Sequence, residues 1–152
     1  FFVGGVRGVT TGSKDAIEVM IDQNGQLGTK SSSIRFKEDV HDMAAASDGL
    51  MRLRPVTYRY KQPYADGSKP IDYGLIAEEV AEVYPDLVAR DADGQIQTVQ
   101  YQKLTPMLLN EVQKEHKLLE QQAKTIELLE KRLAALESAQ PSANQEARLV
   151  AK

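Results

Sequence analysis

The sequence predicts an α+β fold: a small mixed globular domain of short strands and helices, followed by one long C-terminal helix. Two patterns support this prediction. Residues 56–61 alternate apolar and polar side chains, as a half-buried strand does. From about residue 105 to 137 the apolar residues recur in heptads, which is typical of a coiled coil. The 152-residue composition, 41% hydrophobic and 27% charged, is that of a globular protein.

Composition also excludes several classes of function. With 19 basic and 22 acidic residues the net charge is −3, which argues against a protein that mainly grips nucleic acid. No apolar run approaches the roughly 18 residues of a membrane span. The absence of cysteine excludes disulfides, thiol nucleophiles and cysteine-based zinc sites, and we expect no metal and no cofactor. Because the chain begins at Phe1 rather than Met, we expect it to be the C-terminal part of a longer polypeptide.

The N-terminal section is rich in Gly, Val, Thr and Ile, and it predicts two short strands at residues 1–6 and 17–21. Residues 22–28 contain Asn24-Gly25, a pair that favours positive φ and a tight hairpin turn. The section has too little apolar mass to fold by itself. We therefore expect it to pair with upstream sequence or with other copies of the chain.

The next section predicts two helical segments. Phe36, Val40 and Met43 recur at steps of three and four residues, which indicates a possible helical face. Residues 47–53 are predicted as a short helix that has Ser47 as its N-cap and stops before Pro55.

A further helix and a hairpin precede the heptads. Residues 77–84 suit a short helix ended by Pro85. A hairpin is predicted around residues 91–94, whose Asp-Ala-Asp-Gly sequence is similar to the start of a calcium loop. Because the downstream glutamate of such a loop is missing at the required distance, a plain turn is the favoured interpretation.

The heptads extend over about four repeats. The a positions are Val112, Leu119, Ile126 and Leu133, and the d positions are Leu108, Glu115, Gln122, Leu129 and Leu136. Seven of these nine positions are apolar, which favours a coiled coil of about 50 Å over an ordinary surface helix. Gln122 would form a polar layer that fixes register, and in a parallel arrangement Arg132 would face Glu137 of a neighbour. Residues 139–152 have no period and are expected to be frayed.

Most catalytic constellations are missing from the sequence. It contains neither a Walker-type phosphate loop nor an H-E-x-x-H motif. His41 and His116 are interpreted as surface residues, one near a helix end and one at heptad position e.

Residues 31–33 are three serines, followed by Arg35 and Lys37. Lysine can activate a serine when it is neutral, which requires desolvation or a nearby like charge. Ile34 and Phe36 could supply apolar surroundings, and Arg35 the like charge. Composition alone favours loop serines beside a solvated charge pair, so both interpretations stay open.

Several motifs, in order, resemble the intramolecular chaperone auto-processing domain found at the C-terminus of phage tail spikes, endosialidases and tail fibres. Residues 32–37 resemble its S-[DN]-x-R-x-K opening, and residues 53–58 resemble its L-[KR]-P-V-x-[YF] element. Residues 74–80 and 84–88 are similar to G-x-[IL]-A-[QE]-E-V and [FY]-P-[ED]-[LA]-V. Residues 99–101 are similar to the V-[DN]-Y that leads into the family's coiled coil.

The resemblance implies an intramolecular chaperone that registers three chains of a fibrous protein and then cuts itself off. It implies Ser32 as nucleophile, Lys37 as general base, and the Ser31–Ser32 peptide bond as the cleavage site. Ser33 stands where the family has Asp or Asn. A second hydroxyl beside the first makes Ser33 a possible alternative nucleophile.

Simple geometry constrains the two pairings. Side chains five positions apart point to opposite faces of a strand and lie about 140° apart around a helix. Ser32 and Lys37 can therefore meet only across an irregular turn or between neighbouring chains. In either case we expect the pair to form, and cleavage to occur, only once the trimer has assembled. Ser33 and Lys37 are four apart and would adjoin on a helix.

The resemblance also implies a domain plan. Residues 1–31 would end an upstream β-rich stalk, 32–104 would form the globular chaperone, 105–138 a parallel trimeric coiled coil, and 139–152 a tail. The partners would be two further copies of the chain and the upstream fibre region of the same polypeptide, with no nucleic acid and no membrane. The origin would be a phage tail precursor assembled in the bacterial cytoplasm, or a prophage or bacterial surface fibre.

The sequence leaves two alternative functions to consider beside this one. One is a trimeric structural cap of a fibre protein that has the same fold and does not cleave. The other is an enzyme acting on an external substrate, which the sequence disfavours because it contains no other catalytic set. An intact-mass measurement separates cleavage from a permanent cap, since cleavage leaves a fragment that starts at Ser32.

Overall fold

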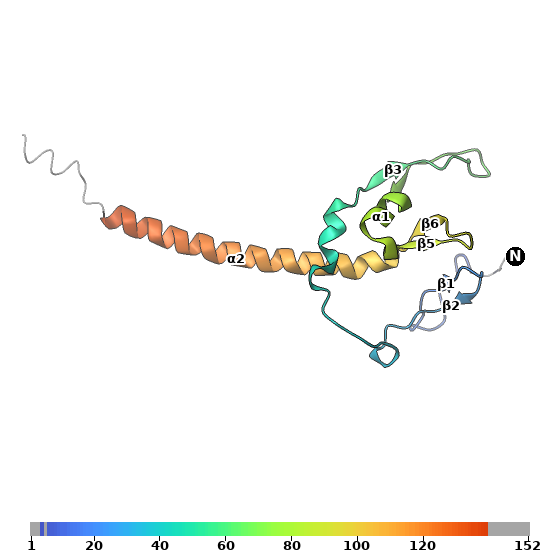
Figure 1. The fold of residues 1–152 in the computed structure, drawn as a ribbon, viewed down its shortest axis with the longest axis horizontal. Coiled ribbons are helices and arrows are strands. Elements are labelled where there is room, and N and C mark those ends of the chain that lie inside the picture. The colour runs from blue at the N-terminus through green and yellow to red at the C-terminus, as the bar shows by residue number, and fades with distance from the viewer. Residues whose placement is uncertain (1–3, 5, 140–152) are drawn as a thin grey trace, which may run out of the picture. The chain divides into compact units, whose positions relative to one another are not determined.

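The structure, a computed structural model, describes residue 4 and residues 6–139 and confirms a mixed α+β fold (Figure 1). The strands are β1 (Met20–Ile21), β2 (Leu27–Gly28), β3 (Val56–Tyr58), β4 (Asp72–Gly74), β5 (Val88–Arg90) and β6 (Ile96–Val99). The 3₁₀ helices are η1 (Ile34–Phe36), η2 (Ala44–Arg52), η3 (Pro85–Leu87) and η4 (Tyr101–Lys103), and the α-helices are α1 (Ala77–Val83) and α2 (Leu104–Ala139).

The chain divides into two compact units. One unit contains the chain up to residue 42 together with residues 54–100. The other contains residues 43–53 and the chain from residue 101 onward, so that η2 groups with α2. The described strands all belong to the first unit and form three two-stranded antiparallel sheets, β1–β2, β3–β4 and β5–β6.

The predicted hairpin at Asn24-Gly25 is confirmed. The Asp22 carboxylate oxygen Oδ1 accepts the backbone N–H groups of Asn24 and Gln26, each at 2.9 Å, and Gly25 adopts a φ of +82°. The strands beside this turn have only two residues each, fewer than the predicted 17–21. Of the strand predicted at residues 1–6, residues 4 and 6 are not in a strand and the others lie outside the described residues.

The helical face predicted for Phe36, Val40 and Met43 is wrong. The backbone makes the single 3₁₀ turn η1 and is extended again at Lys37, with φ −126° and ψ 144°. Asp39 then takes a φ of +52°, which cannot continue a right-handed helix.

The predicted N-cap role of Ser47 is also wrong. The helix η2 begins three residues earlier, at Ala44, and its N-cap residue is Met43. Ser47 lies inside the helix and is fully buried. The helix does end before Pro55, with Leu53 as its extended C-cap, as predicted.

The core of the first unit forms around α1 and the β5–β6 hairpin, which lie side by side (Figure 1). Val80 of α1 is only 1% exposed, and Leu87, Val88 and Val99 are also buried. The helix ends at Val83, two residues before Pro85, and this confirms the predicted helix. Each of the three motifs in this region therefore contributes at least one apolar side chain to the core.

The predicted turn at residues 91–94 is confirmed between β5 and β6. Oδ1 of Asp91 accepts the backbone N–H groups of Asp93 at 3.1 Å and Gln95 at 2.9 Å, and Gly94 has a φ of +79°. The Asp91 carboxylate organises the turn itself, which supports the interpretation of a plain turn.

The hairpin β3–β4 pairs Val56 with Gly74 and Tyr58 with Asp72. The strand is shorter than the predicted 56–61, because the chain beyond Tyr58 enters a long loop. The rings of Tyr58 and Tyr60 meet edge to face with centroids 5.4 Å apart at the start of this loop.

The long helix predicted from the heptads is confirmed as α2, of 36 residues. In the single chain its apolar seam is exposed: Leu119, for example, is 62% exposed and Leu133 57%. Among the described residues, no helix combines the length and apolar character of a membrane span.

An ion pair connects two of the sequence motifs within the first unit. The Arg54 guanidinium donates Nε–H to Oε2 of Glu79 at 3.1 Å, and its Nη2 pairs with Oε1 of the same carboxylate. The contact joins the residue before Pro55 to the first turn of α1 in a bidentate geometry. Through this hydrogen bond, Arg54 holds the pKa of the Glu79 carboxyl below its usual range.

Replacing Glu79 with Gln should lower the free energy of unfolding slightly at neutral pH and leave it unchanged in strong acid. The folded-state pKa is lowered, so the pair stabilises the fold above the ordinary glutamate pKa and loses this effect as the pH falls through the folded value. The effect is small because both side chains are exposed. Urea unfolding of parent and variant in steps from pH 7 to about pH 2 tests this, with exposed Glu78→Gln as control. An equal loss at every pH would contradict the role given to the ion pair.

Candidate functional site

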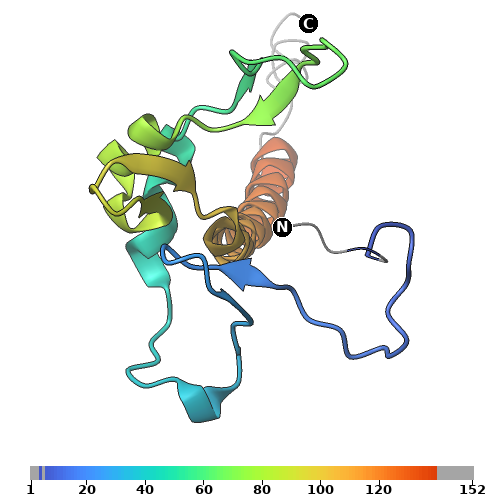
Figure 2. The ribbon, with the colours of Figure 1, turned by 90° about the vertical axis from the view of Figure 1, so that its right-hand side faces the viewer.

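The serine–lysine segment forms one tight turn in an otherwise extended stretch of chain (Figure 2). The Ser31 hydroxyl oxygen accepts the backbone N–H of Ser33 at 3.2 Å. The Ser33 carbonyl accepts the N–H of Phe36 at 3.1 Å, and the Ile34 carbonyl accepts the N–H of Lys37 at 3.0 Å. Backbone and hydroxyl hydrogen bonds therefore determine the shape of this turn.

Ser32 and Lys37 lie on either side of η1, and both are exposed. An irregular turn of this kind is one of the two arrangements in which side chains five positions apart could meet. Within the described residues, no hydrogen bond joins the Ser32 hydroxyl to the Lys37 ammonium. The folded single chain does not by itself bring the pair into reacting contact.

The alternative pairing of Ser33 with Lys37 depended on a helix between them. Both residues have extended backbones and flank the three-residue 3₁₀ turn. Ser33 is half-buried and Lys37 exposed. The helical geometry that would have made these two side chains neighbours is therefore not the one that the segment adopts.

The residues expected to surround Lys37 do not shield it in the single chain. Ile34 is 68% exposed and Phe36 67% exposed. The Arg35 guanidinium lies over the Phe36 ring, 5.0 Å from its centroid, in a cation–π contact. Removal of water from the lysine therefore requires surfaces other than those of Ile34 and Phe36 in this arrangement.

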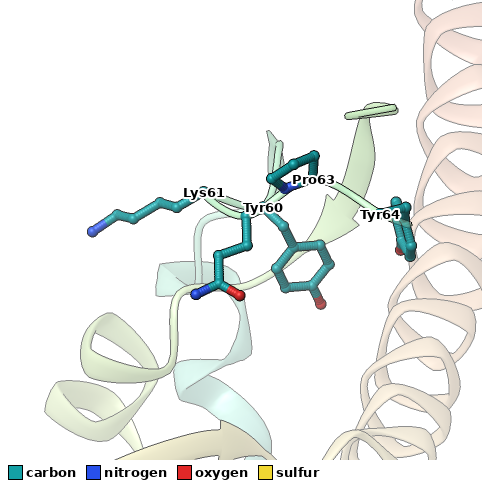
Figure 3. A pocket seen from close by; sticks show the side chains of 5 residues that line it. Tyr60, Lys61, Pro63 and Tyr64 are labelled. Carbon is teal, nitrogen blue, oxygen red and sulfur yellow. The ribbon is translucent and has the colours of Figure 1, made fainter. Parts of the chain in front are cut away.

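A pocket of about 640 Å³ lies in the loop after β3, and neither Ser32 nor Lys37 lines it (Figure 3). Its lining is the single run of residues 60–64. Tyr60 and Tyr64 contribute their rings, while Lys61 extends away from them (Figure 3). The serine–lysine segment is thus separate from this pocket.

A polar cluster that the sequence analysis missed lies in the second unit. Its members are Ser47 and Asp48 of η2 and Asn110, Glu111 and Lys114 of α2. The Lys114 ammonium and, next, the Ser47 hydroxyl hold the pKa of the Glu111 carboxyl below its usual range.

A sequence signal for this cluster existed beside the heptad seam. Leu104, Met107, Glu111 and Lys114 follow one another at steps of three, four and three residues, which places them on one helical face. Leu104 and Met107 are buried, and the Glu111 side chain is only 14% exposed. The first turns of α2 therefore carry a second row of buried side chains in addition to the a and d positions of the heptads.

Residues 32–89 match the family model described as chaperone of endosialidase, a family that carries a peptidase name. The match supports an intramolecular chaperone domain of this type, so the predicted resemblance is confirmed over that range. The peptidase name suggests a self-cleaving domain of the serine peptidase type. No curated protein matches the chain at a significant level.

Proposed function

We propose that this chain, whose residues 32–89 carry a chaperone domain of the endosialidase type, registers three copies of an upstream fibrous protein and then releases itself by cleaving the Ser31–Ser32 bond. The observation that carries the proposal is where the family match begins. Its first residue is Ser32, the residue that cleavage would turn into a new N-terminus. A cut before Ser32 would therefore release the matched domain at its first residue.

The proposed chemistry needs only the two side chains and water. Neutral Lys37 takes the proton of the Ser32 hydroxyl, and the oxygen attacks the carbonyl carbon of Ser31. The bond from that carbon to the Ser32 nitrogen breaks, the lysine returns its proton to the leaving amine, and an ester joins the two residues. Water then hydrolyses the ester, which leaves a carboxylate on Ser31 and a free amino group on Ser32.

Dependence on assembly follows from what the single chain leaves exposed. Ile34 and Phe36 are about two-thirds exposed, so they become an apolar environment for the lysine only when other surfaces cover them. The seam of α2 is exposed along its whole length, and helices of this kind bury such a seam against one another. Both features support a reaction that starts after the copies have assembled.

A non-cleaving trimeric cap is the second candidate. It is favoured by the exposure of both Ser32 and Lys37 and by Ser33 in place of the family's Asp or Asn. Intact mass after expression separates the two functions. A fragment that begins at Ser32 indicates cleavage, and a stable uncut chain indicates the cap.

Ser32→Ala should abolish cleavage and leave folding and trimer formation intact. The side chain is exposed in a turn that it does not stabilise, so its loss removes no core volume. Intact mass and sedimentation of the purified variant check both halves of this expectation. Ser33→Ala is the matched control. If Ser33→Ala is not cleaved and Ser32→Ala is cleaved, the nucleophile is Ser33 and not Ser32.

Lys37→Arg should be as inactive as Lys37→Ala, with cleavage slower than in the parent by about a hundredfold or more. Arginine keeps the charge but does not give up its proton, so it cannot act as a base. The parent rate should rise with pH as more of the lysine becomes neutral. Time courses of cleavage over a pH series test this, with Arg35→Lys as a control for an exchange between the two basic side-chain types in the same segment. An active Lys37→Arg variant with a flat pH profile would remove lysine from the mechanism.

Replacing Ile126 and Leu129 together with Asp should dissociate the trimer and stop cleavage, although the serine–lysine segment is untouched. Six carboxylates would enter the seam, each costing several kcal/mol unless it is protonated or hydrated. Leu128→Asp is the matched control, because this residue lies at heptad position c and is exposed. Sedimentation and gel analysis of both variants decide the matter. Efficient cleavage by a proven monomer would defeat the claim that assembly precedes cleavage.

A further inference from the structure

A buried serine connects η2 to the first turns of α2. Ser47 is fully buried, and its hydroxyl donates to Oε1 of Glu111 at 2.5 Å. The hydroxyl oxygen of Ser47 in turn accepts Nδ2–H of Asn110 at 2.6 Å. A buried hydroxyl requires such partners, since burial without them is unfavourable. These contacts join residues more than sixty positions apart in the sequence.

The same asparagine holds the first residue of η2. Nδ2 of Asn110 also donates to the Ala44 carbonyl at 2.9 Å. Ala44 has a φ of +44°, a region that residues with a Cβ atom rarely adopt. The hydrogen bond from α2 therefore fixes the chain at a point where its backbone is strained.

A lysine completes the network on its solvent side. Nζ of Lys114 donates to Oε1 of Glu111 at 2.7 Å and pairs with Asp48 of η2. Glu111 thus accepts one hydrogen bond from the buried Ser47 hydroxyl of η2 and one from the Lys114 ammonium of α2.

The network and the heptad seam use different faces of the same helical turns. In the heptad register that places Val112 at a, Asn110 is at f, Glu111 at g and Lys114 at c, whereas Leu108 is at d. Other copies of the helix can therefore occupy the seam while η2 stays attached on the outside.

Along the chain, the helix η2 that carries part of the network follows the serine–lysine segment after a short connection. Residues 38–42 follow Lys37, and all of them are exposed and outside regular secondary structure. Ala44 is the first residue after Lys37 whose backbone is held by a side chain of another element. The chain that follows the reactive segment is thus anchored to α2 from Ala44 onward.

We propose that Ser47, Asn110, Glu111 and Lys114 form a positioning clamp that holds η2, the first helix after the Ser32–Lys37 segment, on the outer face of α2, and that self-cleavage requires this clamp. The inference rests on the proposed function. It assigns to these residues a role in placing the segment once the seam has assembled, with no contact to the reacting atoms.

The decisive variant is Glu111→Leu, which keeps a similar side-chain size and removes the oxygens that bind Ser47 and Lys114. We expect the full chain to form trimers as the parent does, because the seam is unchanged, and to cleave at least about tenfold more slowly. Glu111→Gln, which retains an oxygen acceptor, should recover most of the rate. Glu127→Leu is the matched control, since Glu127 makes an exposed pair with Lys131 at 2.5 Å on the same helix.

The pH profile separates positioning from proton transfer. The clamp does not take part in proton transfer, so Glu111→Leu should lower the rate by the same factor at each pH. A trimeric Glu111→Leu variant that cleaves at the parent rate overturns the proposal. If that variant does not assemble, the milder Ser47→Ala replaces it, and failure of both to assemble also overturns the proposal, because the network would then serve assembly alone.

Amide hydrogen exchange distinguishes failure of the clamp from failure of the proposed function. If the parent chain is never cleaved, the proposed function is wrong, and with it the role of the clamp in self-cleavage. Amide exchange in η2 then still tests whether the clamp holds η2 on α2. Faster exchange of residues 44–52 in Glu111→Leu than in Glu127→Leu supports it, and equal exchange in the two variants contradicts it.

Discussion

The apolar seam of α2 is left exposed by the single chain, and the proposed activity depends on its burial. Seven of the nine a and d positions are apolar, and they are exposed in the single chain. A long helix is marginal by itself in water, so most of the stability of such a helix comes from its partners. The contacts of η2 cover another face of the first turns and leave the seam open.

The serine–lysine segment is shaped but not shielded by the single chain. The hydrogen bonds of η1 shape the turn, but Ile34, Phe36 and Lys37 remain exposed. A lysine acts as a base only when it is neutral, and neutrality requires removal of water or a nearby like charge. If neighbouring copies supply that environment, the bond is cut only in correctly assembled fibres. The hydrogen bond from Asn110 to Ala44 would then hold the chain that follows the reactive segment while the helices assemble.

Local signals in the sequence predicted much of the fold. The Asn24-Gly25 turn, the helix before Pro85 and the heptad helix all formed as expected, because turn residues, proline and periodicity act over a few neighbours. The family resemblance over residues 32–89 was also recognisable from its motifs. The role of Ser47 was not predictable in this way, because its partners Asn110 and Glu111 are remote in sequence. The irregular path after Lys37 was missed for a related reason, since an apolar spacing of three and four also occurs in exposed chain.

The most direct test of assembly-licensed cleavage is the concentration dependence of the reaction. Unfolded, uncut chain would be refolded over a dilution series, with cleavage followed by intact mass and the trimer fraction by sedimentation. The account predicts a product that begins at Ser32 and a rate that follows the trimer fraction at every concentration, approaching zero where the chain is monomeric. A rate that stays constant into the monomeric range would contradict it.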